Sequence, residues 1–381
     1  MLRKTIFWIH LSCGVTAGLV VLLMSITGVL LTYERQILAW ADRAVYVEAA
    51  AAAQPLQIGA LLAAVRAQDP TLEPSSITFR PEAGAPLSLG AGRAGSRYVN
   101  PYTGELLGEG AVGLRAFFGA VTGWHRWFNL GGEGRDTARA ITGASNLIFL
   151  FLILSGIYLW LPRVFKWAAF RTRLVFNPRA TTSKARDFNW HHVFGIWTAI
   201  PLAIVVATAV VFSYGWANDL VYRSVGEEPP VRGRGGPPPQ MAAPATAAPG
   251  TRLDLDALTA RAKAQVPGWR QLTLVLPSEN ARTVRFTIDR GNGGQPQHRH
   301  NLALDAVTGE VEQWQPFSSQ PAGQRARTLI RFLHTGEALG IVGQTVAGIV
   351  SLTSIVMVWT GLALAYRRLI APLLKRAARA G

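Results

Sequence analysis

Four stretches of this chain contain no charged side chain, and each is long enough to cross a lipid bilayer. They are residues 5–33, 140–161, 188–218 and 338–366. A membrane-spanning helix needs about 20 mainly apolar residues, so the sequence predicts an integral membrane α-helical protein with a bundle of four transmembrane helices. Residues 235–251 are also uncharged, but their Pro and Ala content is typical of a linker.

The positions of the basic residues predict how the helices are oriented. The formal net charge is +16, and much of it lies in three places: before the first helix, between the second and third helices, and after the fourth. The positive-inside rule places these three parts in the cytoplasm. Because the charge follows the helix ends, it indicates a lipid bilayer as partner and no nucleic acid. A cleaved signal peptide is a weaker interpretation, since the first uncharged run exceeds a signal sequence.

The two long segments between helices are predicted to face outward and to form small α+β domains. Residues 56–65 and 253–264 have helical patterns, and the predicted strands are residues 76–80, 86–89, 97–100, 271–276, 283–289 and 300–304. The only cysteine, Cys13, lies in the first helix, so neither segment can contain a disulfide. The predicted organisation is helix 1–33, domain 34–138, helix 139–161, cytoplasmic basic loop 162–187, helix 188–218, domain 219–337, helix 338–366 and cytoplasmic tail 367–381.

An internal repeat supports this organisation. Thr-Gly-Glu occurs at residues 103–105 and 308–310, and the same separation relates Ser155-Gly156 to Thr360-Gly361. A shared offset in a turn and in a helix indicates an internal duplication. Residues 227–250 have no counterpart in the first half, and their Pro, Gly and Ala content predicts a poorly ordered insert.

Histidines near the helix ends are the candidate functional residues. His10 and His191 lie near the cytoplasmic ends of the first and third helices, while His125 and His334 precede the second and fourth helices on the outer side. Ionisable groups within membrane helices are usually functional, and helical bundles bind haem iron through facing histidines. The sequence therefore predicts two bis-histidine haems, one near each membrane face, with the haem iron as the metal.

Neighbouring residues refine this prediction. No Cys-x-x-Cys-His motif is present, so the haems are of b type. Gly14 and Gly195 follow a histidine by one turn and leave room for a flat ring. His192 is the reserve ligand for His191, and arginines such as Arg126 and Arg331 are candidates for pairing with haem propionates.

Other interpretations of the histidines remain open. Each histidine could belong to the aromatic belt at the membrane interface, and a bare metal site is conceivable although carboxylates are scarce nearby. His298 and His300 would share one face of a strand, where a solvated surface is favoured over a metal site. No catalytic side chain is identified by sequence.

Several motifs together resemble the PepSY-associated transmembrane family. They are residues 10–14, 98–108 (YVNPYTGELLG), 124–128 (WHRWF), 155–163 (SGIYLWLPR), 191–195, 304–310 and 333–337 (LHTGE). The resemblance implies four helices interleaved with periplasmic PepSY-like domains in a bacterial inner membrane. Within the family the chain is most similar to ferrisiderophore reductases of the FoxB type, which implies haem b ligated by His10, His125, His191 and His334. Ala209, where other helices have Gly, and the insert at 227–250 depart from the pattern.

The resemblance implies an oxidoreductase that passes electrons to a periplasmic ferric siderophore and releases Fe(II). No segment predicted to be cytoplasmic is long enough to form a flavin- or nicotinamide-binding domain, so a quinol or a separate reductase is the expected electron donor. Trp124, Trp127 and Trp314, with nearby arginines, are candidates to flank the chelate. The alternative is a non-catalytic membrane-anchored PepSY protein that restrains or senses a periplasmic partner. An iron or haem transporter is disfavoured because the helices lack acidic residues.

Overall fold

The computed structural model describes residues 1–48, 54–92, 95–230 and 251–380. These residues form two compact units. The first contains residues 1–34, 116–226 and 329–381, and the second contains residues 35–115 and 227–328. The predicted division into a helical membrane part and an extramembrane part therefore corresponds to two units, each assembled from separate parts of the chain.

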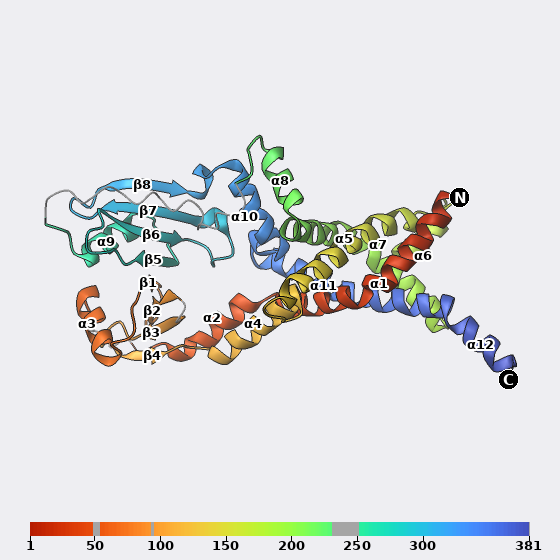
Figure 1. Ribbon diagram of the computed structural model, residues 1–381, viewed down its shortest axis with the longest axis horizontal. Helices are drawn as coiled ribbons and strands as arrows, with labels where there is room; N and C mark the ends of the chain where they lie inside the picture. The colour runs from red at the N-terminus through yellow and green to blue at the C-terminus, as the bar shows by residue number, and fades with distance from the viewer. Residues whose placement is uncertain (49–53, 93–94, 231–250, 381) are drawn as a thin grey trace. The chain divides into compact units, whose positions relative to one another are not determined.

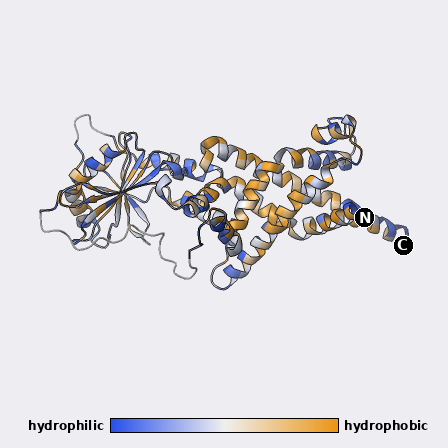
Figure 2. Cartoon of the chain, turned by 90° about the horizontal axis from the view of Figure 1, so that it is seen from above, coloured by the Kyte–Doolittle hydropathy of each residue, from blue (hydrophilic) through white to orange (hydrophobic). Residues whose placement is uncertain are grey.

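The first unit is a helical bundle built on the four predicted membrane helices (Figure 1). They are α1 (Leu2–Leu31), α5 (Gly134–Trp160), α7 (Ser183–Ser213) and α11 (Gly340–Leu369). All four are long and apolar enough to cross a membrane, which confirms that prediction. Helices α1 and α7 each pack against both α5 and α11. Figure 2 shows the hydrophobic residues concentrated along these helices.

Shorter helices flank the bundle helices, and the sequence patterns did not predict them. They are α4 (Val112–Trp127), α6 (Trp167–Leu174), α8 (Gly215–Ser224), α10 (Ala322–His334), the 3-10 turn η5 (Glu337–Leu339) and α12 (Ala371–Ala380). Helix α7 ends at Ser213 rather than at residue 218, because Tyr214 has an extended backbone with φ −124° and ψ 128°. The residues after Tyr214 form α8 as a separate helix.

Buried polar side chains hold the bundle helices together. The Ser25 hydroxyl donates to Ser354 Oγ at 3.1 Å, and the Asn146 amide donates to the Val206 carbonyl at 3.1 Å. Gln344, only 1% exposed, donates to the Thr32 carbonyl at 3.0 Å. In an apolar medium an unpaired polar group is costly, so each of these residues fixes the contact between two particular helices.

The second unit contains a single antiparallel sheet of eight strands, in the order β4-β3-β2-β1-β5-β6-β7-β8. The strands are β1 (Ser76–Phe79), β2 (Leu87–Gly90), β3 (Ser96–Val99), β4 (Leu106–Gly108), β5 (Gln271–Val275), β6 (Thr283–Asp289), β7 (Arg299–Asp305) and β8 (Val311–Pro316). The remaining elements are α2 (Glu34–Ala41), η1 (Asp42–Val45), α3 (Ile58–Gln68), α9 (Leu255–Gln265), η3 (Pro296–His298) and η4 (Phe317–Ser319). The sequence did not predict β4, β8 or α2.

The two long segments share this sheet, whereas the sequence predicts two separate domains. The first segment supplies β1 to β4 and the second supplies β5 to β8. Strands β1 and β5 pair antiparallel at the centre, with Ile77 opposite Leu274. Separate four-stranded sheets would each expose a central edge of unpaired N–H and C=O groups, and this pairing removes both edges.

The core of the second unit lies between the sheet and the helices α3 and α9. Leu61 of α3 and Leu258 of α9 are fully buried beside Ile77, Leu89 and Leu302 of the sheet. Successive side chains of a strand point to opposite faces of the sheet, so Thr78 and Ser88 point away from this core. Both predicted extramembrane helices are therefore confirmed, and they serve one common core.

The two repeated turns make the same hydrogen bonds. The N–H of Asn100 donates to the Glu105 carbonyl at 2.9 Å, as the N–H of Asp305 does to the Glu310 carbonyl. The side chain at the first position then accepts from the two backbone N–H groups that lie two and three residues later, in both turns. The two turns therefore have the same local structure, while the duplication itself stays a prediction.

The first residues of the predicted disordered insert have defined contacts. The carboxylate of Glu227 accepts hydrogen bonds from the N–H groups of Ala322 at 2.7 Å and Gly323 at 2.9 Å, at the beginning of α10. An acidic group at a helix beginning satisfies free N–H groups and complements the helix dipole. Residues 231–250 of the insert lie outside the described residues.

Candidate functional site

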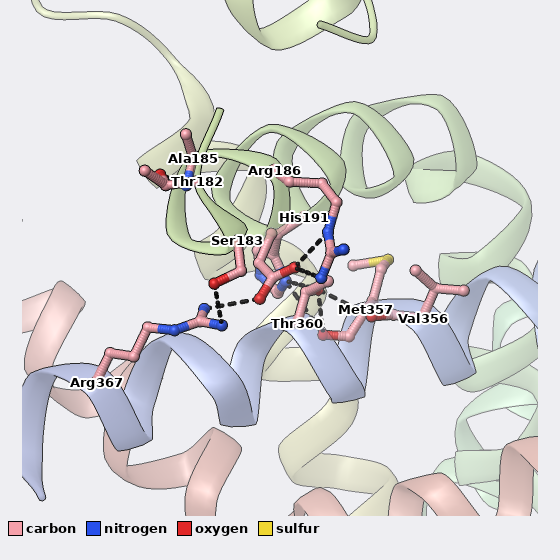
Figure 3. Close-up of polar contacts among 10 residues, drawn as sticks. Thr182, Ser183, Ala185, Arg186, His191, Val356, Met357, Thr360 and Arg367 are labelled. Carbon is pink, nitrogen blue, oxygen red and sulfur yellow. Dashed lines mark hydrogen bonds and ion pairs between the residues drawn. The ribbon is translucent and has the colours of Figure 1, made fainter. Parts of the chain in front are cut away.

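Each of the four predicted ligand histidines contacts a hydroxyl group on a neighbouring helix. His10 of α1 lies 2.8 Å from Ser155 Oγ of α5, and His191 of α7 lies 3.1 Å from Thr360 Oγ1 of α11. In each case the ring atom is Nδ1. Figure 3 shows the contact of His191 with α11. Both histidines therefore face the interior of the bundle.

The other two histidines repeat this arrangement on the short helices. His125, near the end of α4, places Nδ1 2.9 Å from Thr27 Oγ1 of α1. His334, the last residue of α10, places Nδ1 3.3 Å from Thr208 Oγ1 of α7. Helix α1 thus carries His10 and contacts His125 of α4. In the same way, α7 carries His191 and contacts His334 of α10.

The hydrogen bonds determine which ring nitrogen carries the proton. The Nδ1 atoms of His191 and His334 also contact backbone carbonyls, Met357 O at 3.1 Å and Val205 O at 2.9 Å. A carbonyl only accepts, so Nδ1 must be the donor. The Ser155 and Thr27 hydroxyls donate their own hydrogens to carbonyls four residues earlier, at 2.7 Å each. They therefore accept from Nδ1 of His10 and His125.

This proton arrangement leaves Nε2 of all four rings with a free lone pair. Neutral histidine has one N–H, and Nδ1 uses it in each ring. Within the described residues, no hydrogen bond reaches any of the four Nε2 atoms. Metal-binding histidines donate the N–H of their second ring nitrogen to a carbonyl or another polar group in the same way, so each of these rings keeps one nitrogen that could bind a metal ion.

The rings of His125 and His334 lie opposite each other at one end of the bundle. Their centroids are 6.3 Å apart and their planes are inclined by 56°. Two imidazoles that bind one metal ion at about 2.0 Å each have centroids roughly 6 Å apart. The separation of these two rings therefore fits a bis-histidine metal centre such as haem iron.

His10 and His191 form the second predicted pair. They come from α1 and α7, which pack against the same two helices, and they are close enough to interact electrostatically. Each is bonded to a different one of those shared neighbours, α5 for His10 and α11 for His191. The bundle thus brings the rings of His125 and His334 together, whereas the pairing of His10 with His191 stays a prediction.

Small residues follow the hydroxyl partners and allow the rings to approach. A Cβ atom added to Gly361 would lie 3.3 Å from His191 Cε1, and one added to Gly156 would lie 3.5 Å from His10 Cε1. Gly28 has the same relation to His125 at 3.7 Å. Ala209 follows Thr208 in the fourth contact. These residues, rather than Gly14 and Gly195, are the ones next to the rings.

Gly14 and Gly195, which the sequence predicted to leave room for a flat ring, are not next to the histidine rings. Gly14 has no atom within 4 Å of an added Cβ, and a Cβ added to Gly195 would lie 3.5 Å from Met357 Cε. The reserve ligand His192 differs from His191 as well. Its Nδ1 donates to Phe188 O of its own helix at 2.8 Å, and its ring lies 4.1 Å from the Phe188 ring, inclined by 36°. Its contacts are within one helix, so the geometry favours His191.

The predicted pocket residues lie beside His125 and His334. Trp124 is 45% exposed, and the guanidinium carbon of Arg126 lies 4.7 Å from the Trp127 ring centroid. Arg331, one turn before His334, lies over the Phe332 ring at 5.7 Å. Burial, followed by the charges of Arg139, Arg135 and Arg331, lowers the pKa of Arg126. Trp314 belongs to the sheet unit, where it stacks on His300.

The comparison with known families agrees with this architecture. The family described as the PepSY-associated TM region matches residues 7–368. The chain belongs to this family. No curated protein matches the sequence. The matched range includes the four histidines of this PepSY-associated membrane protein and all four of their hydroxyl partners.

The histidines of the sheet unit differ from the prediction. His298 ends the 3-10 turn η3, whereas His300 lies in β7, so they are not on one strand face. His300 stacks on Trp314 with centroids 5.0 Å apart, and its buried Nδ1 has no hydrogen-bond partner. The described residues contain no group of three or more His, Cys, Asp or Glu arranged to hold a metal ion.

Sequence reasoning did not identify the roles of the hydroxyl residues. The sequence indicates Ser155 and Thr360 only as part of the internal repeat, and it predicts no role for Thr27 or Thr208. A signal was present, because each precedes Gly or Ala within a membrane helix. That dipeptide supplies both an acceptor for an imidazole and the space for its ring.

Proposed function

We propose that this PepSY-associated membrane protein is a haem-b-dependent oxidoreductase that delivers electrons across the membrane to a ferric siderophore and releases Fe(II). The observation that carries the proposal is the common geometry of His10, His191, His125 and His334. Each ring donates from Nδ1 to a neighbouring helix and keeps Nε2 free. A tether for the sheet unit would need none of these hydrogen bonds.

The four histidines would hold haem iron in two pairs. His125 and His334 would hold one haem, and His10 and His191 would hold the other. Bound in this way, haem supplies reversible one-electron chemistry, and two protein ligands suit electron transfer better than oxygen binding. The residues of this chain fix the ring orientations through the hydrogen bonds to Nδ1.

The proposed reaction needs a donor and an acceptor for electrons. The donor is a quinol or a separate reductase at the end of the bundle that carries His10. The acceptor is a ferric chelate at the end that carries His125, where Fe(III) gains one electron and leaves as Fe(II). Oxygen-rich chelators hold Fe(II) less tightly than Fe(III), so reduction releases the metal.

Absorption spectroscopy of the purified full-length protein tests the cofactor assignment. We expect a Soret band and a sharp α band that appears on reduction with dithionite. A colourless protein from cells that are supplied with haem would contradict the proposal. It would leave the chain as a membrane anchor for its sheet unit.

Single substitutions test the pairing. His125→Ala and His334→Ala should each remove the same haem, about half of the total, and the double variant should lose no more than either one. His10→Ala and His191→Ala should remove the other. His192→Ala is the matched control and should retain both. Full haem content in any of the four single variants would show that the pairing is wrong.

A further inference from the structure

Four arginines gather at the end of the bundle that carries His125 and His334. They are Arg126 at the end of α4, Arg135 and Arg139 in the first turns of α5, and Arg331 in the last turn of α10, and we call them the arginine cluster. All four are exposed. The charge of Arg126 interacts with those of the other three. The four arginines therefore share one end of the bundle and are accessible from outside the protein.

The turn between α4 and α5 builds this cluster. Arg126 and Arg135 both lie over the ring of Trp127, with Cζ 4.7 Å and 4.1 Å from its centroid. Between them, Phe128 and Asn129 have positive φ values of 53° and 55°. Non-glycine residues rarely adopt this conformation, and strained backbone of this kind is concentrated at functional sites.

The cluster forms no ion pair within the described part of the chain, although Glu133 and Asp136 lie in the same turn as Arg135 and Arg139. None of its four members forms an ion pair with Asp or Glu there. Like charges repel, so the fold bears an electrostatic cost that no ion pair among the described residues offsets. The location is also unusual, because the end predicted to face outward is where membrane proteins carry fewer basic residues. An external anion would balance these charges.

A cofactor alone would not neutralise the cluster. A haem carries two propionates, and pairing with them would leave two of the four arginines unpaired. Arg331 lies one turn before His334, and Arg126 is adjacent to His125, so the excess charge is next to the proposed acceptor end. We propose that the arginine cluster binds a carboxylate-bearing ferric chelate, which makes the substrate an anionic complex. This inference rests on the proposed function.

The test uses gallium citrate as the probe, because Ga(III) resembles Fe(III) but is not reduced. Binding is measured by equilibrium dialysis with the full chain, its cofactor present, in nanodiscs of neutral phosphatidylcholine. We expect saturable binding that weakens as salt rises. The double variant Arg126→Gln/Arg135→Gln should weaken binding by at least about tenfold, the effect of one lost charge-assisted hydrogen bond.

Two controls accompany this measurement. Arg171→Gln/Arg179→Gln removes the same charge from the basic loop at 162–187 and should leave citrate affinity unchanged. A neutral gallium trihydroxamate should show no dependence on the arginine cluster. Haem content is measured for every variant. If citrate binds a protein without haem, the anion site stands and the proposed function fails.

Three outcomes would overturn the inference. Equal citrate affinity in wild type and the double variant would show that the cluster does not bind the probe. Loss of haem from the double variant would assign the arginines to the propionates. Phosphatidylglycerol that copurifies with wild type but not with the variant, together with absent citrate binding, would identify lipid headgroups as the occupant.

Discussion

The guanidinium of Arg367 donates a hydrogen bond to the carboxylate of Asp187, with 2.7 Å between Nη1 and Oδ2 (Figure 3). This contact joins the last turns of α11 to the first turn of α7. His191 lies one turn further along α7, and its acceptors Thr360 and Met357 lie on the same face of α11. The ion pair therefore fixes the two helices whose alignment positions His191.

Asp187→Ala should destabilise the bundle by roughly 2 kcal/mol, since the hydrogen bonds from two arginines to a buried carboxylate are lost. The side chain of Asp187 is 2% exposed, whereas those of Arg186 and Arg367 reach water. Unfolding in detergent, followed by circular dichroism, measures the change. Lys184→Gln, on the exposed side of the same turn, is the matched control. Equal melting of both variants would show that the pair is not structural.

The membrane helices were predictable because an uncharged run of more than about 20 residues rarely forms any structure other than a membrane-spanning helix. The extramembrane strands were mostly predictable from their alternation. The shared sheet could not be predicted, because β1 and β5 are far apart in sequence and the residues of neither strand indicate which partner it pairs with. The polar sequence of β8 (VEQWQP) and the brevity of β4 hid those two edge strands.

The candidate site was partly predictable. Histidines are rare in membrane helices such as those of His10 and His191, and His125 and His334 directly precede such helices, so all four could be chosen as candidates from the sequence alone. Their partners Ser155, Thr27, Thr360 and Thr208 were not, because hydroxyl residues in such helices often bond only to their own backbone. Whether such a hydroxyl also contacts a histidine on a neighbouring helix depends on how the helices pack, and that packing cannot be read from the sequence.

Ser155→Ala should weaken haem binding at His10 more than Thr360→Val weakens haem binding at His191. Ser155 is the hydroxyl acceptor for His10 Nδ1, whereas His191 keeps the Met357 carbonyl when Thr360 is replaced. Loss of such a partner lowers metal affinity by roughly 10–100-fold. Haem retention during dialysis against apomyoglobin, with the midpoint potential, measures both variants. A larger loss in Thr360→Val would contradict the assigned hydrogen bonds.

Gly361→Ala should disturb His191, since the added Cβ would lie 3.3 Å from Cε1 of its ring. The ring or the helix must shift by a few tenths of an ångström. Gly14→Ala is the matched control, because it adds the same methyl group where no atom lies within 4 Å. That change should be neutral or stabilise α1 by up to about 1 kcal/mol. Thermal melting and the haem spectrum distinguish the two, and identical spectra would argue against crowding at Gly361.

Asp305→Asn should remove a pH dependence from the stability of the sheet unit. The backbone N–H groups of Thr308 and Val307, followed by the charge of Arg282, lower the pKa of Asp305 below its usual value of 3.8. A lowered pKa stabilises the fold fully above 3.8, and this contribution is lost as pH falls through the folded value. The variant reproduces the uncharged Asn100 of the other turn. Urea unfolding at pH 7 should favour the wild type, and the difference should shrink below pH 3.8. A difference that stays constant with pH would show that the carboxylate charge contributes nothing to this turn.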